Sequence, residues 1–292
     1  MESILVLQRV LPQHHDVAKV DERLARQLLH RRVDLDRHHR RRLLGHHRGD
    51  QAETLAFRAL RGSGAAGLQL ARDKVRAKKS VAALGVAVPR QYRAGDAARL
   101  RRLPHPLFVK LRHGDGSDAI GTSALVRTAA QLRERLRITA GLNQGATLCE
   151  EYIEGRDLFV ALLGNQPEVL HPLELVVGRQ GRDAPRFATG RLKHDDAYKR
   201  RWQVSYRKAK LPASVLRGIN HASRQIFHAL KLRDYARIDY RLTPDNRLVF
   251  IEANPNPDLG RHTFGRERCF VDVAYPDLIQ RILAAARQRY AG

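Results

Sequence analysis

The chain has few cysteines, few acidic residues and no long hydrophobic run. Its 292 residues include two cysteines, Cys149 and Cys269, which are too few for a disulfide framework. We therefore expect a reducing, cytoplasmic environment. No apolar stretch approaches the roughly 18 residues of a membrane-spanning helix, and no secretory signal opens the chain. These absences argue against a disulfide-bonded secreted protein and against an integral membrane protein.

Acidic residues are outnumbered, with 30 Asp and Glu against 54 Lys and Arg, and the net charge is +24. Such an excess of positive charge is typical of proteins that bind nucleic acid. Only ten of the basic residues are lysine, however, and the arginines are spread over every segment of the chain. This distribution indicates a general preference for arginine over lysine, so we do not expect nucleic acid as the main partner.

The order of apolar patterns predicts an α+β fold. Residues 3–10 predict a strand and residues 16–30 an amphipathic helix, followed at 31–51 by an Arg- and His-rich stretch that we expect to be disordered. From residue 62 the elements follow closely. Helices are expected at 65–84, 128–139, 212–232 and 272–290, and strands at 107–111, 146–152, 158–163 and 167–177. Largely antiparallel sheets that carry helices fit this order.

Residues 235–254 predict a β-hairpin with one polar and one apolar face. Two strand-like runs flank the turn residues 244–247. If the hairpin is symmetric about the middle of this turn, Asp239 lies opposite Glu252 and Arg237 opposite Asn254. Because side chains alternate with a period of two, all four point to the same face. The other face carries an apolar set, Ala236, Ile238, Tyr240, Leu242, Val249, Ile251 and Ala253.

The polar face of the hairpin brings two carboxylates together. Carboxylates that face each other across a hairpin have Cβ atoms about 5 Å apart and repel each other. A cation between them would account for the pattern, and such oxygen ligands suit Mg²⁺, which shares its coordination shell with waters and phosphate oxygens. For the hairpin taken alone, a solvated sheet face is the alternative interpretation.

Three upstream features bear on the hairpin. Lys110 ends a strand and precedes a loop with three glycines and Ser117, where backbone N–H groups can close around phosphate oxygens. The segment CEEYIEGRD, from Cys149 to Asp157, ends a strand in acids and can offer a backbone edge and a carboxylate to a purine and a ribose. Lys74 lies in a helix. Taken singly, the loop is weak evidence, and the acidic segment and Lys74 are also compatible with ordinary solvated surface.

Together and in this order, the features resemble the ATP-grasp superfamily, and most closely its D-alanine–D-alanine ligase branch. The resemblance runs from about residue 62 to residue 292. It rests on four segments: GSG…ARDKVRAKKSVAALGVAVP, LFVKL with its Gly-rich loop, CEEYIEGRDLFVALLGN, and ARIDYRL…LVFIEANPNP. It implies an ATP-grasp domain at 62–292, with two α+β subdomains that grip ATP. Residues 1–61 would form a short, atypical N-terminal βα region.

The resemblance also implies roles for individual residues. Arg237 would stabilise the transferred phosphoryl group and the tetrahedral intermediate. Two Mg²⁺ ions, with Mn²⁺ as an alternative, would be bound by Asp239, Glu252 and Asn254. The implied ATP-binding residues are Lys74, Lys110 and Lys193 at the phosphates, Ser117 in the Gly-rich loop, Glu150 and the Ile153 backbone at the adenine, and Asp157 at the ribose. Arg191 and Lys199 compete with Lys193 for the third cationic position.

The implied function is ATP-dependent ligation of a carboxylate to an amine. A substrate carboxylate would attack the γ-phosphate of ATP to give an acyl phosphate, and an amine would then displace phosphate to form an amide. Metal ions and cationic side chains supply most of the catalysis in such reactions. The expected partners are small molecules, an amino acid or another carboxylate and an amine. The sequence leaves open whether the chain forms a homodimer.

Two departures from the family pattern keep other functions open. About 61 residues precede the match and lack the family's Gly-rich turn and glutamate for the first amino acid, through either a shortened domain or a shifted reading frame. After Asn254 the chain continues with PNPDL (255–259), where the family has a small-residue turn and a serine. The alternatives are an ATP-grasp ligase of different amino-acid specificity in secondary metabolism and a non-catalytic basic ATP-binding protein.

Overall fold

A computed structural model describes most of the chain from residue 62 onward. The described residues are 62–93, 106–113, 121–141, 147–181, 183–257, 259, 270 and 272–291. The strand expected at 3–10, the helix expected at 16–30 and the disorder expected at 31–51 lie outside these residues, as do Ser117 and Cys269. The division of the chain at residue 61 therefore stays a prediction.

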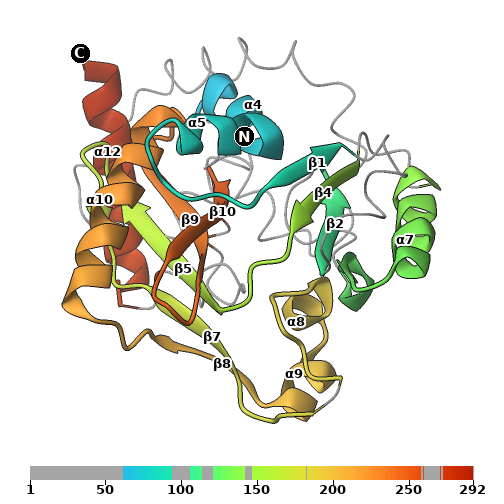
Figure 1. The fold of residues 1–292 in the computed structure, drawn as a ribbon. Coiled ribbons are helices and arrows are strands. Elements are labelled where there is room, and N and C mark those ends of the chain that lie inside the picture. Colours follow the sequence, from blue (N-terminus) through green and yellow to red (C-terminus); the bar gives the residue numbers. More distant parts are fainter. Residues whose placement is uncertain are drawn as a thin grey trace, which may run out of the picture.

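Two antiparallel sheets form the framework (Figure 1). The smaller sheet has the strand order β1-β4-β2-β3, and the larger sheet has the order β10-β9-β5-β7-β8, with β6 paired to β5. The smaller sheet consists of β1 (Gln91–Arg93), β2 (Leu107–Leu111), β3 (Leu125–Val126) and β4 (Thr147–Glu151). The larger consists of β5 (Arg156–Leu163), β6 (Glu168–Val169), β7 (Leu173–Val177), β8 (Val204–Lys208), β9 (Tyr235–Leu242) and β10 (Leu248–Asn254).

Helices cover both sheets (Figure 1). The cluster that includes α4, α5 and α10 packs on the larger sheet, α12 packs on residues of β5 and β9, and α7 packs on the smaller sheet. The helices are α4 (Ala65–Arg72), α5 (Lys74–Ala82), α7 (Ala129–Gly141), α8 (Gly190–His194), α9 (Asp196–Trp202), α10 (Ala213–Ala229) and α12 (Tyr275–Ala291), with a 3₁₀ turn η2 at Thr122–Ala124. The expected α+β arrangement with antiparallel sheets is confirmed.

The main core lies between α10 and one face of the larger sheet. The buried residues of α10 recur at helical spacing, Ile219, Ala222, Ser223, Ile226 and Phe227. They meet the even-numbered side chains of β5 and β9. Full burial of such an aliphatic or aromatic side chain contributes about 1.5–3 kcal/mol. The odd-numbered side chains of both strands point to the opposite face, where the polar residues of β9 lie.

The single helix expected at 65–84 is two helices, which is a correction. Asp73 adopts an extended backbone conformation (φ −83°, ψ 94°) between α4 and α5, and its carboxylate accepts bonds from the Val75 and Arg76 N–H groups. The same carboxylate accepts two bonds from Arg112, at 2.9 and 2.7 Å. An Asp that caps a helix and binds a neighbouring strand end outweighs the helical periodicity of the sequence.

The strand expected at 167–177 is also interrupted. β6 and β7 are separate strands, and His171 and Pro172 lie between them. Proline has no N–H to donate to a ladder, so the strand cannot run through it. A capping box begins α7, the helix expected at 128–139. Thr128 Oγ1 accepts from the Gln131 N–H, while Gln131 Oε1 accepts from the N–H of Arg127, one residue before the threonine.

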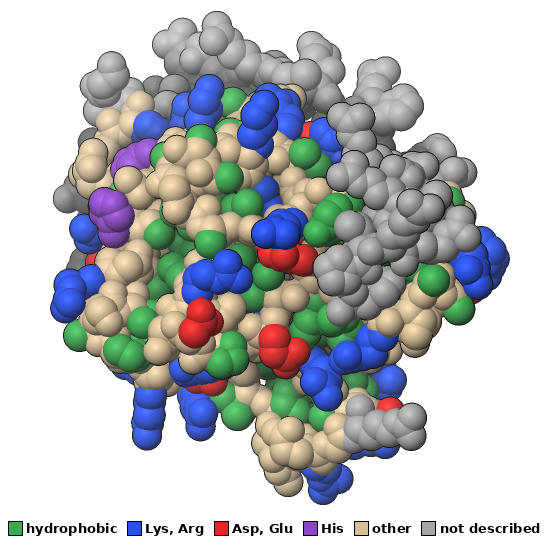
Figure 2. Space-filling view, in the orientation of Figure 1, with side chains coloured by type: hydrophobic (Ala, Val, Ile, Leu, Met, Phe, Trp, Pro, Cys, Tyr) green, Lys and Arg blue, Asp and Glu red, His purple; other side chains and the backbone are tan. Residues whose placement is uncertain are grey.

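Basic side chains are distributed widely over the surface. Figure 2 shows Lys and Arg spread over the visible face, with acidic side chains between some of them. This agrees with the scatter of arginines along the sequence. Within the described part of the chain, no helix combines the length and the apolar character that crossing a bilayer requires.

Candidate functional site

The β9–β10 hairpin has the expected pairing at its polar end. Asp239 is paired with Glu252 and Arg237 with Asn254, so the predicted register of these four residues is confirmed. Nearer the turn the register shifts by one residue, between Phe250 and Glu252. A β-bulge therefore divides the hairpin. The pairing predicted from symmetry about the turn holds for the residues beyond the bulge, away from the turn, and is shifted by one residue between the bulge and the turn.

The bulge corrects the predicted apolar face. Phe250 is completely buried and packs in the main core beside Tyr240, with ring centroids 6.3 Å apart. Ile251, expected in that core, lines a pocket next to Glu252. Val249, also expected there, is paired with Arg241, whose side chain faces the pocket. One extra residue on a strand reverses the alternation of side chains on one side of the bulge, and the turn signal could not reveal it.

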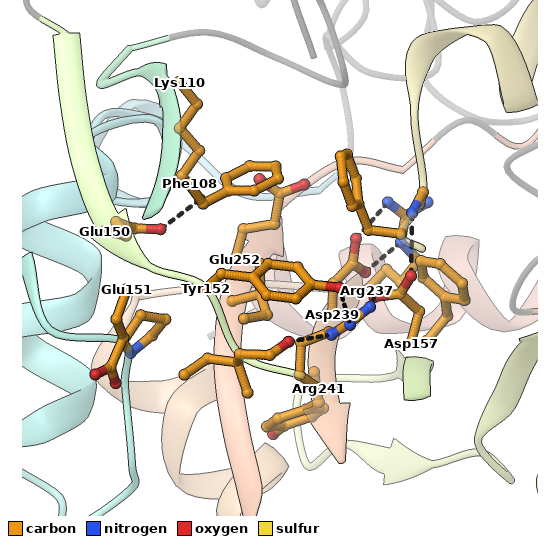
Figure 3. Close-up of a pocket in the computed structure, with 17 residues that line it drawn as sticks. Phe108, Lys110, Glu150, Glu151, Tyr152, Asp157, Arg237, Asp239, Arg241 and Glu252 are labelled. Atoms are coloured by element: carbon orange, nitrogen blue, oxygen red, sulfur yellow. Dashed lines mark hydrogen bonds and ion pairs between the residues drawn. The ribbon is translucent and has the colours of Figure 1, made fainter. Parts of the chain in front are cut away.

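A pocket lies between the two sheets and gathers most of the predicted site residues (Figure 3). β2 and β4 contribute residues from the smaller sheet, and β5, β9 and β10 contribute residues from the larger sheet. The predicted residues that line it are Lys110, Glu150, Ile153, Asp157, Arg237, Asp239 and Glu252. Asn254 lies at the end of β10, opposite Arg237 and outside the pocket lining.

Arg237 and Asp239 form a buried pair at the hairpin end of the pocket. Arg237 Nε and Nη2 donate to the two oxygens of Asp239 at 2.7 and 2.9 Å. Both residues are buried, with 6% of Arg237 and 9% of Asp239 exposed, and the guanidinium lies 5.5 Å from the ring centroid of Phe159. The fork of an arginine matches a carboxylate and also matches a phosphoryl group. A guanidinium whose geometry suits a phosphoryl group therefore lies beside the carboxylate of Asp239, which is itself paired with Glu252 across the hairpin.

A second buried cluster surrounds Glu150, for which the family resemblance implies a position at the adenine. Lys110 Nζ lies 2.9 Å from Oε2, Lys78 Nζ lies 2.7 Å from Oε1, and Gln91 donates to Oε1 at 3.1 Å. Burial alone raises the pKa of Glu150, but the two ammonium groups outweigh it and lower the pKa to about 2.

Lys78 was missed by the sequence interpretation. Its side chain is completely buried, and this burial lowers its pKa to about 7 although Glu150 acts in the opposite direction. It lies four residues after Lys74, on the same helix face, so helical spacing was the available signal. Lys74 is buried at the start of α5, its N–H donates to the Arg112 carbonyl, and it is not part of the pocket lining.

Arg241 is the second residue that the sequence interpretation missed. It follows Arg237 and Asp239 at a period of two on β9, which places all three on one face. Its guanidinium donates to the Ile153 carbonyl at 3.0 Å and to Asp157 Oδ1 at 2.8 Å. Two residues predicted to bind adenine and ribose are therefore held by one buried arginine (Figure 3).

Aromatic rings form the apolar part of the pocket. Phe187 packs edge-on against Phe108 at 4.9 Å between centroids and against Tyr152 at 6.3 Å. Phe108 belongs to the smaller sheet, while Phe187 precedes α8, so the contact joins different parts of the chain across the pocket. Flat apolar rings beside a backbone edge form a surface suited to a purine base.

The third cationic position stays a prediction. Lys193 is on α8, but its side chain lies outside the described residues. Of its two competitors, Arg191 pairs with Asp195 at 2.9 Å and Lys199 pairs with Asp196 at 2.5 Å. Neither competitor lines the pocket.

A family model described as D-ala D-ala ligase C-terminus matches residues 89–284, more than half of the chain. The chain belongs to this family. The match covers both sheets of the pocket and the whole β9–β10 hairpin. Membership in this ATP-grasp branch, whose members are ATP-dependent carbon–nitrogen ligases, confirms the resemblance inferred from the four sequence segments.

Relatives of known sequence agree with this assignment. The uncharacterized protein y4sG of Sinorhizobium fredii is 32% identical over 252 residues, which cover 79% of this chain and 67% of that protein. The D-alanine–D-alanine ligase of Desulforudis audaxviator is 27% identical over 236 residues, covering 78% of this chain and 72% of the ligase.

Solved structures share the ATP-grasp fold. The VanG D-Ala:D-Ser ligase of Enterococcus faecalis superposes with a TM-score of 0.61 at 21% identity, over 81% of this chain and 69% of that one. The D-alanine–D-alanine ligase of Bacillus anthracis complexed with ATP gives a TM-score of 0.61 at 20% identity, over 82% and 76% of the two chains. The predicted fold class is confirmed.

Proposed function

We propose that the ATP-grasp ligase domain at 62–292 joins a carboxylate to an amine through an acyl phosphate. The observation that carries the proposal is the meeting of two groups of residues in one pocket. Arg237, Asp239 and Glu252 come from the larger sheet, and Lys110 and Glu150 come from the smaller one. Lys110 and Arg237, which suit a triphosphate, thereby lie in one pocket with Asp239 and Glu252, which suit a metal ion.

The nucleotide would span the pocket from one group to the other. We assign the base to the aromatic side, near Glu150 and the Ile153 backbone, and the ribose to Asp157. The phosphates would extend past Lys110 toward the hairpin. Support for ATP as the nucleotide comes from the ligase of Bacillus anthracis, which was solved in complex with ATP. Lys74, Ser117 and Lys193 are retained as further phosphate-side residues.

We assign the metal ions to Asp239, Glu252 and Asn254. The donor set fits Mg²⁺, because two carboxylates and one amide oxygen at adjacent positions of a hairpin leave coordination sites for waters and phosphate oxygens. Within the described part of the chain, no cluster of three or more His, Cys, Asp or Glu residues competes as a metal site. Bound ions would neutralise charge on the triphosphate and orient it.

The reaction would proceed in two balanced steps. A carboxylate oxygen of the first substrate attacks the γ-phosphorus of ATP, and the bond to the β,γ-bridging oxygen breaks, which gives ADP and an acyl phosphate. The amine of the second substrate then attacks the acyl carbon, loses a proton and displaces phosphate. Arg237 would turn its fork from Asp239 toward the transferring group, where negative charge accumulates.

One observation favours an amino-acid specificity that differs from that of D-alanine–D-alanine ligases. In the turn after Asn254, Asn256 Oδ1 accepts the Ser63 N–H at 2.9 Å, and Ser63 Oγ donates to the Pro255 carbonyl at 3.1 Å. A Cβ atom on Gly62 would come within 2.3 Å of Asn256 Oδ1. The turn therefore uses its polar groups to bind the chain at 62–63, which leaves less of it for an amino-acid substrate.

A panel of substrates tests the proposal. Phosphate release from Mg-ATP is measured with D-alanine, D-serine, L-amino acids and simple carboxylates, each with and without an amine acceptor. Release that depends on both a carboxylate and an amine is the expected result, and the best pair reveals the specificity. Tight binding of Mg-ATP without turnover on any pair would favour the non-catalytic ATP-binding alternative.

The proposal that the partners are small molecules in the cytoplasm is also compatible with the state of Cys149. Cys149 is buried with a free thiol, whose pKa burial raises to about 12. A thiol of this kind is inert and suits the reducing cytoplasm that we infer. A homodimer and a monomer are both compatible with this proposal, and nucleic acid is not among the proposed partners.

A further inference from the structure

Arg241 binds several parts of the pocket wall at once. Besides its bonds to Ile153 and Asp157, Nη1 donates to the Arg186 carbonyl at 3.2 Å and Nη2 to the Tyr152 hydroxyl at 3.1 Å. The residue is only 4% exposed. A buried guanidinium with four acceptors is held in one orientation, and it holds its partners in turn.

These partners belong to the crossing between the two sheets. Residues 152–155 connect β4 of the smaller sheet to β5 of the larger sheet, and Arg241 itself lies on β9 of the larger sheet. Arg186 precedes Phe187, which reaches Phe108 of the smaller sheet. Arg241 therefore joins the crossing segment, the segment before α8 and the larger sheet at the wall of the proposed nucleotide pocket.

The carboxylate of Asp157 is oriented by two of these contacts. Oδ1 accepts from Arg241 at 2.8 Å, and Oδ2 accepts from the N–H of Ala188 at 3.0 Å. An ionised carboxylate offers about four lone-pair sites, so each oxygen can still accept a ribose hydroxyl. A lysine at 241 could not reproduce the fork that reaches Asp157 and Ile153 together.

Arg241 is separated from the proposed chemistry. It lies four residues beyond Arg237 on β9, about 13 Å along the strand, with Asp239 between them. A change at Arg241 should thus act on nucleotide binding and leave phosphoryl transfer nearly intact.

We propose that Arg241 is a positioning residue that gives the nucleotide pocket its selectivity for the ribose, by fixing Asp157 and the Ile153 backbone in one arrangement. The inference rests on the proposed function, because it assumes that the pocket binds ATP. It assigns a role to a residue outside the proposed phosphate and metal sites. It also has a specific consequence, that discrimination between ribose and deoxyribose nucleotides depends on Arg241.

The test uses the full chain and calorimetric binding of Mg²⁺ complexes of ATP, 2′-deoxy-ATP and 3′-deoxy-ATP. Wild type should prefer ATP over at least one deoxy analogue by about tenfold or more, the size of a lost hydrogen bond to a charged group. Arg241→Lys should weaken ATP binding about tenfold. It should also bring the dissociation constant of the discriminated deoxy analogue close to that of ATP, so that their ratio is near one. With the best substrate pair, KM for ATP should rise while kcat stays within about threefold.

Two further variants make the result specific. Arg247→Lys is the matched control, since Arg247 is exposed in the turn of the same hairpin and should keep wild-type selectivity. Asp157→Asn should reproduce the loss of selectivity, and adding it to Arg241→Lys should cost little more, because both changes remove the same oriented carboxylate. If Arg241→Lys does not fold, Asp157→Asn carries the test.

The possible outcomes distinguish failure of this inference from failure of the proposed ligase function. Wild type that does not bind ATP would overturn the proposed function and this inference together. Wild type that binds ATP without ribose discrimination, or Arg241→Lys with unchanged discrimination, would overturn the inference and leave the ligase proposal standing. A large fall in kcat of Arg241→Lys with unchanged nucleotide affinity would also overturn the inference, because such a result would mean that Arg241 takes part in phosphoryl transfer.

Discussion

Asp239 and Glu252 lie directly opposite each other across the β9–β10 hairpin, just beyond the bulge that shifts its register. Both line the pocket between the sheets, and Asp239 is paired with Arg237 at 2.7 and 2.9 Å. Two facing carboxylates repel each other unless positive charge lies between or beside them. Arg237 supplies part of that charge beside Asp239, Lys110 and Lys78 interact electrostatically with Glu252, and the proposed metal ions would add further positive charge during the reaction.

Glu252→Gln tests the metal assignment. The change keeps the shape of the side chain but removes one charge from the proposed metal site. We expect ATP turnover to fall by at least about two orders of magnitude and the concentration of Mg²⁺ that gives half-maximal turnover to rise, while the thermal unfolding midpoint changes little.

The matched control is Glu168→Gln, on the short strand β6 of the same sheet, where the side chain contacts Arg281 outside the pocket. It should keep wild-type turnover. Near-normal turnover and Mg²⁺ dependence in Glu252→Gln would remove Glu252 from the metal site.

Arg237→Lys tests the role of the fork of donors at the hairpin. A lysine keeps the charge but loses one of the two bonds to Asp239 and cannot follow two oxygens of a transferring phosphoryl group. We expect ATP affinity by calorimetry to stay within about threefold and turnover to fall by roughly a hundredfold or more, the pattern of an interaction made mainly in the transition state.

Arg233→Lys serves as the control for this variant, because Arg233 is exposed just before β9 and does not line the pocket. Equal losses of affinity and turnover in Arg237→Lys would instead make Arg237 a phosphate clamp of the ground state.

The cluster around Glu150 predicts how stability depends on pH. Its folded-state pKa of about 2 lies below the ordinary value of 4.5, since Lys110 and Lys78 outweigh the effect of burial. A depressed carboxyl pKa contributes stability that is fully present above pH 4.5 and is lost as the pH falls toward 2. The free energy of unfolding in urea should therefore show this loss in wild type.

Glu150→Gln provides the comparison, because Asp73, whose pKa is lowered mainly by its bond with Arg112, contributes to the acid region in both proteins. Above pH 4.5 wild type should be the more stable of the two, since the variant leaves two buried ammonium groups without their carboxylate. The difference should shrink between pH 4.5 and 2. A difference that stays constant over this range would mean that Glu150 does not titrate with a lowered pKa.

Local sequence determined most of the helices and strands and the pairing at the end of the hairpin that lies away from its turn. Strand alternation and turn residues act over a few positions, so they were sufficient to place Arg237 opposite Asn254 and Asp239 opposite Glu252. The strand at Leu107–Leu111 and the capping box of α7 follow from equally local signals. For the same reason, four short segments in a fixed order were enough to indicate the family.

Contacts between distant segments were decided only by the tertiary structure. The bulge that buries Phe250 and turns Ile251 into the pocket arises where two strands pack on a core, and the break at Asp73 arises from its contacts with Arg112. Lys78 and Glu150 are 72 positions apart, and Arg241 lies 84 positions from Asp157. Charge and periodicity along one segment carry no information about which buried partner a side chain will meet, because that depends on how the two sheets come together.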